Sequence, residues 1–322
     1  MDTVVIGAGW AGLTAAREMA WAGHEVVVLE KSRGPGGRSS TRRNNGARFD
    51  HGAQYFTARS AAFGRQLQQW RDAGLVRSWR PRIAVFGDKS AHQDSEDVTR
   101  FVAMPGMNGV CRHMAQDLDC RFEQRVTGLH FDRQWRLELE SGDSLQARRL
   151  LITAPPAQAA ALLGAADPLH DQLAGVSFAP CIAGLLSFEK PLDPGFDAAF
   201  VNQPGALSWV ACNSTKPGRE GNNWVLHAGA QWSKAHIELA FEEMAERLAG
   251  AFVELAGSPV PPLAARQAHR WRYAQAEQPL DTGLLVDPAR RLAIAGDWLA
   301  GSRIEGAWTS GRKAGEWLAD SG

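Results

Sequence analysis

The sequence contains few cysteines, no long apolar run and no excess charge of either sign. The four cysteines, at positions 111, 120, 181 and 212, are widely spaced and form no Cys-x-x-Cys pair. This spacing indicates neither a zinc site nor a disulfide framework, so we expect a reducing compartment. No apolar stretch approaches the roughly 18 residues that a membrane helix needs. The 35 basic side chains balance 35 acidic ones, so the chain has no general attraction to nucleic acid or to an anionic membrane.

Several motifs of other enzyme classes are also missing. The chain has no Gly-x-Ser-x-Gly elbow and no His-Glu-x-x-His motif, and its nine histidines show no metal-ligand spacing. We therefore expect no metal site. A strand that begins at Thr3 leaves no room for a secretory signal. The protein is expected to be cytoplasmic, with no membrane and no nucleic acid as partner.

The first thirty residues have the pattern of a β-α-β unit, in a chain whose 322 residues suggest two domains. Residues 3–6 form a short β-branched run, which predicts a buried parallel strand. Apolar residues then recur at helical spacing from Leu13 to Ala20, and Gly23 ends this helix. Residues 26–29 form a second apolar strand, which ends at Glu30.

A glycine-rich turn, Gly7-Ala8-Gly9-Trp10-Ala11-Gly12, joins the first strand to the helix. Gly7 permits the tight bend, Gly9 lets the backbone approach a pyrophosphate, and Gly12 lets helix and strand pack closely. The helix N-terminus offers free N–H groups and a positive dipole end to phosphates. Glu30 can accept hydrogen bonds from both ribose hydroxyls and would repel a 2′-phosphate. The pattern predicts dinucleotide binding rather than a tight turn without a ligand. It does not distinguish NAD from FAD.

Two further segments favour FAD over NAD. Gly36-Gly37-Arg38 follows Glu30 closely, and near the C-terminus Gly296-Asp297 follows a strand and Glu305-Gly306-Ala307 opens a helix. An NAD enzyme has no need for this second loop-then-helix element. A flavin needs an acceptor for its ribityl hydroxyls, which Asp297 can supply. Its N1–C2=O edge becomes anionic on reduction, and the N-terminus of the last helix can stabilise that anion.

Between these ends the sequence pattern predicts further elements. Helices are expected at 61–73, 106–118, 237–256 and 306–319, and strands at 150–153, 182–188, 224–229 and 292–295. Residues 121–147 are expected to form a small antiparallel meander, residues 50–56 to be extended, and residues 31–46 and 87–97 to be loops. A nucleotide-binding start and a matching end indicate one discontinuous domain with a second domain inserted into it.

The sequence resembles the flavin amine oxidase superfamily through its glycine turn, Glu30, Gly36-Gly37-Arg38 and Gly296-Asp297. Within the superfamily it resembles the renalases more closely, especially the bacterial forms, and this resemblance runs essentially end to end. The segments that carry it are Lys31-Ser32-Arg33-Gly34, Gly52-Ala53-Gln54-Tyr55-Phe56, Leu226-His227, Arg270-Trp271-Arg272-Tyr273 and Gly296-Asp297-Trp298.

The resemblance implies an α/β fold with a glutathione-reductase-like, FAD-binding Rossmann domain that is discontinuous in sequence, and an inserted mixed α+β substrate domain. The FAD-binding domain would comprise residues 1–60, 100–160 and 288–322. The substrate domain would comprise residues 61–99 and 161–287.

The resemblance also implies which residues bind FAD. The pyrophosphate would lie against the glycine turn and the basic loop, at Gly7, Gly9, Trp10, Ala11, Gly12, Gly37 and Arg38. The adenosine would be bound by Glu30, Lys31 and the backbone of Val126. The flavin end would lie beside Ala53, Gln54, Tyr55, Gly296, Asp297, Glu305, Gly306 and Ala307. For Arg42 and Arg43, in the same basic loop, a role as solvated cations stays open.

For the reaction, the resemblance implies oxidation of off-pathway isomers of NAD(P)H, whose hydride sits at C2 or C6 of the nicotinamide. The hydride would pass to flavin N5, and O2 would reoxidise the flavin with release of H2O2. Loss of hydride restores an aromatic pyridinium, so the site has to stack the rings and needs no general base. Candidates for the substrate face are Gln54, Tyr55, His227, Trp271 and Arg303. A purely structural role stays open for each of four candidates: Tyr55, His227 and Trp271 could be packing residues, and Arg303 a cation in a loop.

Two other functions stay open. An amine oxidase or another dehydrogenase of the superfamily would oxidise an amine or a hydrocarbon carbon, and amine oxidases of this superfamily often place a lysine near flavin N5. None of the six lysines, at positions 31, 89, 190, 216, 234 and 313, lies in an obvious equivalent motif, which favours the dihydronicotinamide substrate. A flavin-binding redox sensor without turnover is the third alternative.

Overall fold

The two ends of the chain meet in one six-stranded sheet. A computed structural model describes residues 1–44, 46–88, 98–257 and 259–321. Across the sheet the strands are β18 (Leu285–Asp287), β19 (Leu292–Ile294), β12 (Arg149–Ile152), β1 (Thr3–Ile6), β2 (Val26–Glu30) and β8 (Asp119–Phe122). β12 and β2 flank β1 in parallel, and the edge strand β18 pairs antiparallel with β19. The central strands are buried along their whole length, which explains their nearly continuous apolar sequences.

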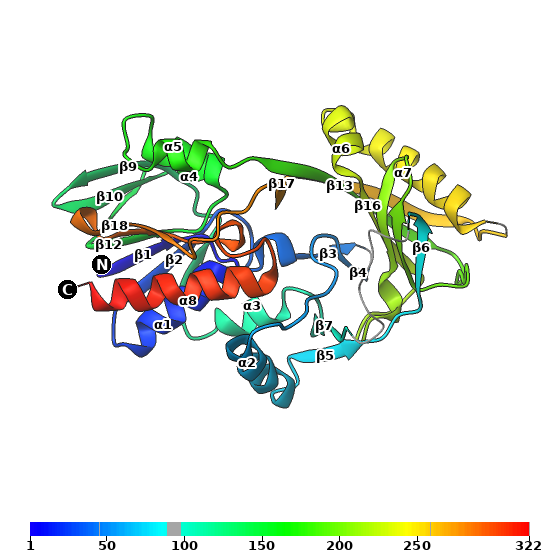
Figure 1. Ribbon diagram of the computed structural model, residues 1–322, viewed down its shortest axis with the longest axis horizontal. Coiled ribbons are helices and arrows are strands. Elements are labelled where there is room, and N and C mark those ends of the chain that lie inside the picture. Colours follow the sequence, from blue (N-terminus) through cyan, green and yellow to red (C-terminus); the bar gives the residue numbers. More distant parts are fainter. Residues whose placement is uncertain (45, 89–97, 258, 322) are drawn as a thin grey trace.

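Helices α1 (Trp10–Trp21) and α8 (Ile304–Asp320) pack against each other on one side of this sheet (Figure 1). A Cβ added to Gly311 would lie 2.2 Å from the carbonyl oxygen of Ala11, and one added to Gly315 would lie 2.8 Å from that of Ala15. Because no larger side chain fits at these positions, the two helix backbones touch. The last helix is thereby held against the helix that follows the glycine turn. Helices α2 (Ala61–Asp72) and α3 (Gly109–Met114) pack into the same core.

A smaller antiparallel sheet and two short helices pack on the other hydrophobic core of this lobe. They are β11 (Ser144–Ala147), β10 (Gln134–Leu139), β9 (Val126–Asp132), α4 (Pro156–Leu163) and α5 (His170–Ala174). Trp135 and Leu137 of β10 are buried in one cluster with Val27 and Leu150 of the central strands. The six-stranded sheet is therefore covered on both faces.

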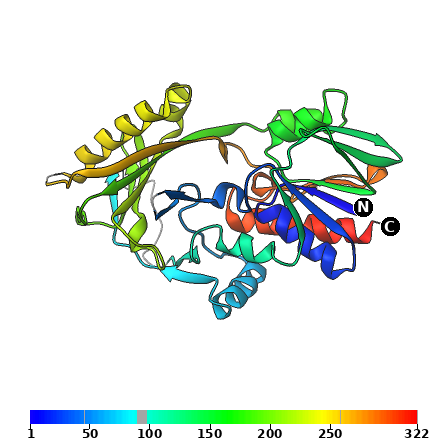
Figure 2. The same ribbon diagram turned by 180° about the vertical axis from the view of Figure 1, so that it is seen from behind.

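A second six-stranded sheet forms the other lobe. Its strands, in order, are β17 (Leu263–Ala276), β13 (Phe178–Phe188), β16 (Asn223–Ala228), β15 (Leu207–Cys212), β14 (Ala198–Asn202) and β6 (Ile83–Gly87). Helices α6 (Ala230–His236) and α7 (Phe241–Ala256) lie against it, and Met244 and Leu248 of α7 are fully buried. The long strands β13 and β17 reach from this sheet toward the lobe that contains the first six-stranded sheet (Figures 1 and 2).

Two short strand pairs lie in the middle of the molecule, one of them near α2 (Figure 1). They are β3 (Thr41–Asn44) with β4 (Ala47–Asp50), and β5 (Val76–Trp79) with β7 (Arg100–Ala103). Phe49 of β4 packs against Leu185 and Val225 of the second sheet. This contact fixes the β3–β4 hairpin, and with it the following residues 51–55, against that sheet. None of the described helices is long and apolar enough to cross a membrane.

The structure confirms the α/β class and the two chain ends in one sheet, while the domain boundaries stay predictions. Several element boundaries are wrong. The expected loop at 31–46 contains a 3-10 helix, Gly37–Ser39, and strand β3, because Phe49 gives the hairpin an apolar residue to bury. The expected meander at 121–147 begins with residues of β8, which pairs with β2 instead. Of the expected loop at 87–97, residues 89–97 lie outside the described residues.

Three of the expected helices also have different bounds. The helix expected at 106–118 is only α3, because residues 106–109 close a turn, with the Gly109 N–H 2.8 Å from the Gly106 carbonyl, and residues 115–118 form turns again. The helix expected at 237–256 begins later, as α7, and α6 precedes it as a separate helix. The helix expected to start at 306 starts two residues earlier, at Ile304.

Candidate active site

Of the three glycines of the glycine turn, only Gly9 has free space beside it. Gly7 has a φ of +109°, in the left-handed region that favours glycine, and a Cβ on Gly12 would lie 2.0 Å from the Gly7 carbonyl oxygen. A Cβ on Gly9, by contrast, would meet no atom within 4 Å. Gly9 is the N-cap of α1, where the first N–H groups of the helix have no partner inside the helix. Gly7 and Gly12 are therefore required by the fold itself, whereas Gly9 borders a space in which the helix N-terminus can bind a phosphate.

Glu30 fixes the neighbouring strand end. Its side chain is buried, and its two carboxylate oxygens accept from the backbone N–H groups of Ala8 and Ser32 at 2.9 and 2.8 Å. Hydrogen bonds to a charged acceptor are stronger than neutral ones, so the carboxylate is held firmly at the carboxyl end of β2. It lies beside the glycine turn, as the predicted ribose contact requires.

Arg38 and Asp297 connect the two ends of the chain. Two Arg38 nitrogens donate to the two Asp297 carboxylate oxygens at 3.0 and 2.5 Å, and Arg38 also donates to the carbonyl of Ala274 at 3.1 Å. Gly37 lies beside Gly9, because a Cβ on Gly37 would be 3.7 Å from the Gly9 Cα. Residues predicted to bind the pyrophosphate and the ribityl chain are thus close together, although they are far apart in the sequence.

The start of α8 packs tightly on the turn that contains Asp297. The N–H of Gly296 donates to Ser310 at 3.0 Å, and a Cβ on Gly306 would lie 2.3 Å from the carbonyl oxygen of Ala300. Glu305 accepts from the backbone N–H groups of residues 59 and 60 at 2.9 and 2.7 Å. Its carboxylate therefore ties α8 to the chain that enters α2. Ala307, in the first turn, donates to the carbonyl of residue 303 at 2.9 Å.

The other predicted cofactor residues lie around the turn. Trp10 donates to the hydroxyl of Ser39 at 2.9 Å, which connects the glycine turn to the basic loop. Lys31 is on the surface and donates to Gln158 at 3.0 Å. Val126 is buried at the start of β9. Their contacts with a cofactor stay predictions.

One row of side chains crosses the second sheet. Strand pairing sets Trp209 opposite His227, His227 opposite Ala183, and Ala183 opposite His269. Residues directly opposite each other point to the same face of a sheet, so this row spans β15, β16, β13 and β17. The adjacent residues Leu226 and Ala268 belong to the apolar cluster under α7. The row therefore lies on the face away from α7.

The backbone carbonyl of His51 joins two of the predicted substrate residues. It accepts from His227 Nε2 at 3.3 Å and from Trp271 Nε1 at 2.9 Å. A carbonyl can only accept, so the proton of neutral His227 is on Nε2 and its Nδ1 is an acceptor. The His51 ring also contacts the rings of His269 and Trp271, with centroids 4.6 and 5.0 Å apart.

The three histidines of this region are held neutral. Burial, reinforced by His269 and Arg42, lowers the pKa of His51 to about 3. Burial lowers the pKa values of His227 and His269 to about 4. At neutral pH this region therefore presents uncharged imidazoles.

The structure brings four of the five substrate candidates together. Gln54 and Tyr55 directly follow the segment whose carbonyl holds His227 and Trp271. The Tyr55 ring lies among Trp79, Trp209 and the Arg100 guanidinium, with distances of 6.2, 5.7 and 5.3 Å. Arg303 is exposed at the N-cap of α8, and no side-chain hydrogen bond or ion pair among the described residues joins it to the other four.

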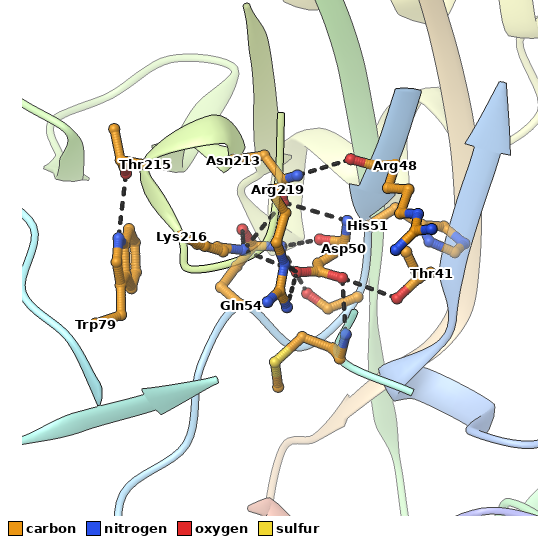
Figure 3. A network of polar contacts seen from close by, with 12 residues as sticks. Thr41, Arg48, Asp50, His51, Gln54, Trp79, Asn213, Thr215, Lys216 and Arg219 are labelled. Carbon is orange, nitrogen blue, oxygen red and sulfur yellow. Dashed lines mark hydrogen bonds and ion pairs between the residues drawn. The ribbon is translucent and has the colours of Figure 1, made fainter. Parts of the chain in front are cut away.

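A buried ionic cluster adjoins residues 51–55 (Figure 3). Two Arg219 nitrogens donate to the Asp50 carboxylate at 3.0 and 2.7 Å, and the Lys216 ammonium lies 3.6 Å from the same carboxylate. Lys216 also donates to the side-chain oxygens of Gln54 and Asn213 at 3.1 and 3.3 Å. Sequence reasoning missed this cluster: Lys216 belongs to no motif, and its partner Gln54 is 162 positions away.

The cluster shifts the pKa values of its own members. Burial alone would raise the pKa of Asp50, but Lys216, Arg219 and the N–H of Met107 hold it below its usual range. Burial lowers the pKa of Lys216 to about 8; Asp50 opposes this shift and Arg219 reinforces it. The amide nitrogen of Gln54 donates to the carbonyls of residues 50 and 52, so both ends of its amide are engaged.

Comparison with known proteins assigns the chain to a family. Residues 70–316 match the family described as flavin containing amine oxidoreductase, and residues 5–70 match the NAD(P)-binding Rossmann-like domain. The chain therefore belongs to the flavin-containing amine oxidoreductases. It is a flavin-dependent oxidoreductase of the amine oxidase superfamily, and its cofactor is FAD.

Individual relatives match over shorter stretches. A Mycobacterium tuberculosis protein named as a flavin-containing monoamine oxidase is 37% identical over 107 residues, 27% of this chain and 23% of the relative. Phytoene desaturase of Fusarium fujikuroi is 33% identical over 107 residues, 31% of this chain and 18% of the relative. These matches thus span less than a quarter of either relative.

Two solved structures share the fold along nearly the whole chain. One is an Exiguobacterium protein named as a protoporphyrinogen oxidase, with a TM-score of 0.78, 12% identity and coverage of 99% of this chain and 98% of that chain. The other is a putrescine oxidase, with a TM-score of 0.75, 14% identity and coverage of 98% of both chains.

The residues present fit FAD. The open side of Gly9, next to Gly37 and the α1 N-terminus, can receive the pyrophosphate. Glu30 lies where an adenosine ribose can donate to it, and Asp297 offers carboxylate oxygens near the start of α8 for the ribityl hydroxyls. These donors and acceptors come from both ends of the chain, as an extended dinucleotide requires.

Replacing Gly9 with alanine is expected to weaken FAD binding at least tenfold and to leave the free energy of unfolding of the apoprotein nearly unchanged, because its Cβ enters open space. Gly12→Ala is the matched variant. There the Cβ meets the Gly7 carbonyl, so the apoprotein should lose about 1–3 kcal/mol of stability. FAD titration and urea unfolding of both apoproteins separate the two effects. Wild-type FAD affinity in Gly9→Ala would contradict the assignment.

Proposed function

We propose that the protein oxidises isomeric dihydronicotinamide dinucleotides, with hydride at C2 or C6, to NAD(P)+, and that O2 is reduced to H2O2. When bound, FAD supplies the hydride acceptor. The proposal rests on one observation: the sheet face formed by Trp209, His227, His269 and Trp271 is uncharged at neutral pH. It presents neutral imidazoles and indoles, and among the described residues it includes no carboxylate that could bind an ammonium group.

The carboxylates on the segments that adjoin this face are already paired. Asp50 accepts from Arg219 and lies beside Lys216, and Asp297 is paired with Arg38. The positive charge of Lys216 would repel a cationic amine, and no unpaired carboxylate on these segments would attract it. A dinucleotide carries negative phosphates, which cations attract. This arrangement supports an anionic nicotinamide substrate over an amine.

The neutral face also suits a hydride transfer that needs no base. Loss of hydride restores an aromatic nicotinamide ring, so no residue has to remove a proton. Trp271 is fixed by its bond to the His51 carbonyl and offers an indole surface, while His227 offers Nδ1 as an acceptor. We infer that these two residues orient the nicotinamide and exclude water.

Anaerobic mixing of the FAD-loaded protein with the 2- and 6-dihydro isomers, and separately with a panel of amines, tests the proposal. We expect the isomers to bleach the flavin absorbance rapidly, and added O2 to restore it with release of H2O2. Bleaching by amines but not by the isomers would overturn the proposal in favour of an amine oxidase, which the names of some relatives support. Bound flavin that neither class reduces would indicate a redox sensor.

The variant His227→Ala examines how the face works. We expect flavin reduction to slow about tenfold, because the nicotinamide loses an orienting partner. The pH dependence of that rate should not change between about pH 5.5 and 7.5, because the pKa of His227 is about 4 and its imidazole is neutral throughout. His130→Ala, on the exposed surface, is the matched control. A pH-dependent step that disappears with His227 would show that it acts as a base.

A further inference from the structure

The buried cluster next to residues 51–55 contains two cations and one carboxylate. The side chains of Asp50, Lys216 and Arg219 have no exposed surface. Asp50 and Arg219 form a close pair at 2.7 Å, and Lys216 is farther from the carboxylate at 3.6 Å. When Lys216 is protonated, the cluster contains two positive charges and one negative charge, so its net charge is +1.

No other described group that faces Lys216 supplies the missing negative charge. From β5, Trp79 presents its ring, 5.4 Å from the ammonium. From the end of β15, Cys212 is a neutral thiol, because burial raises its pKa. From β16, His227 is neutral, because burial lowers its pKa to about 4. The remaining partners, Gln54 and Asn213, are uncharged amides.

Lys216 is bonded to Gln54, one of the residues 53–55 that are predicted to lie beside the flavin. Its ammonium donates to the Gln54 amide oxygen at 3.1 Å, and the amide nitrogen donates back to the carbonyl of Gly52 at 3.0 Å. This inference rests on the placement of residues 53–55 beside the flavin, which the proposed function also uses. Gln54 is thus the residue of this segment that bonds directly to the Lys216 ammonium.

We propose that Lys216 is a positioning residue that holds an uncompensated positive charge behind Gln54 and thereby favours the reduced flavin. Reduction adds negative charge to the flavin ring. A fixed positive charge in a water-poor interior stabilises such a charge more strongly than it would in water. Lys216 thus acts through Gln54 and need not touch the substrate.

The same geometry predicts that the charge can be removed without unfolding the protein. In Lys216→Met the Asp50–Arg219 pair remains, and the cluster becomes neutral. Methionine has a similar length and can pack on Trp79. Removing one member of a buried ionic cluster is destabilising when it leaves a charge uncompensated, and here Asp50 and Arg219 still balance each other. Lys216→Gln, which can still bond to Gln54, serves as a second neutral variant.

The reduction potential of the bound flavin, measured by equilibration with a reference dye, tests the proposal. At pH 6.5 we expect Lys216→Met to disfavour reduction at least tenfold, equivalent to a potential about 30 mV lower for a two-electron couple. Wild type loses its ammonium as the pH rises through about 8, so the two potentials should converge by about pH 9.5. Lys216→Arg keeps its charge at high pH, so its flavin potential should stay above that of Lys216→Met even at pH 9.5. Lys234→Met removes a surface lysine and is the matched control.

Two results would overturn the proposal. One is an equal potential in wild type and in both neutral variants at pH 6.5. The other is a difference that persists unchanged at pH 9.5, because a lost charge cannot explain it. Neither result depends on which substrate reduces the flavin. If the dihydronicotinamide isomers fail to react, the proposed substrate is wrong while the potential still reports on Lys216.

Discussion

Replacing Asp50 with asparagine is expected to lower the free energy of unfolding by about 3–5 kcal/mol. The reason is that Asp50 is the carboxylate shared by two buried cations, Lys216 and Arg219. Asparagine keeps the shape and can still accept from Thr41 and Met107, but it leaves both cations without an opposite charge. Urea unfolding of the apoprotein at neutral pH measures the change.

Two comparisons separate this charge effect from general damage to the hairpin. Adding Lys216→Met to Asp50→Asn removes one of the unpaired cations, so the double variant should recover part of the lost stability. Asp193→Asn breaks an exposed ion pair with Arg82 and should leave stability nearly unchanged. A cost below about 1 kcal/mol for Asp50→Asn would contradict the buried-cluster interpretation.

The pH dependence of stability gives an independent check on Asp50. The folded protein holds the pKa of this carboxyl below its ordinary value of about 4. Its contribution to stability is therefore fully present above about pH 4 and is lost as the pH falls through the lowered, folded-state pKa. The difference in stability between wild type and Asp50→Asn should accordingly narrow in acid.

The parts of the fold that the sequence predicts correctly depend on local constraints. Gly7 and Gly12 are required by a bend and a close contact within six residues of each other, so the turn can be recognised without knowing the rest of the chain. The sequence predicts Arg38 and Asp297 only as two separate contacts with one cofactor. The structure shows that the two side chains also bond to each other.

The buried cluster could not be predicted in the same way. The resemblance predicts a site role for Gln54, but nothing local indicates that Lys216 is fully buried or that it bonds to Gln54. Its burial results from the packing of residues near β4 and β5 against the loop after β15, where Lys216 is 162 positions from Gln54 and Thr215 is 136 positions from Trp79. Likewise, His51 and His269 meet only because β17 lies along the edge of the second sheet. Contacts of this kind depend on the tertiary fold and have no periodic pattern.

Replacing Glu30 with alanine is expected to weaken FAD binding about 100-fold or more and to yield purified protein with little flavin. Each hydrogen bond to a charged group contributes about 1.5–3 kcal/mol, and a ribose can donate two. A loss of about 2.7 kcal/mol corresponds to a factor of 100 in affinity. Glu30 also accepts from Ala8 and Ser32, so its removal loosens the glycine turn as well.

Two variants show which of these contributions dominates. Glu30→Gln keeps one acceptor oxygen and loses the charge, so we expect an affinity between those of wild type and Glu30→Ala. Glu25→Ala, just before β2 and exposed, should bind FAD as wild type does. Titration of each apoprotein with FAD gives the dissociation constant, and urea unfolding shows whether the fold is intact. Because both Glu30 oxygens already hold the turn, a folded Glu30→Ala protein with full flavin occupancy would mean that the carboxylate serves the turn alone, and that the ribose is bound elsewhere.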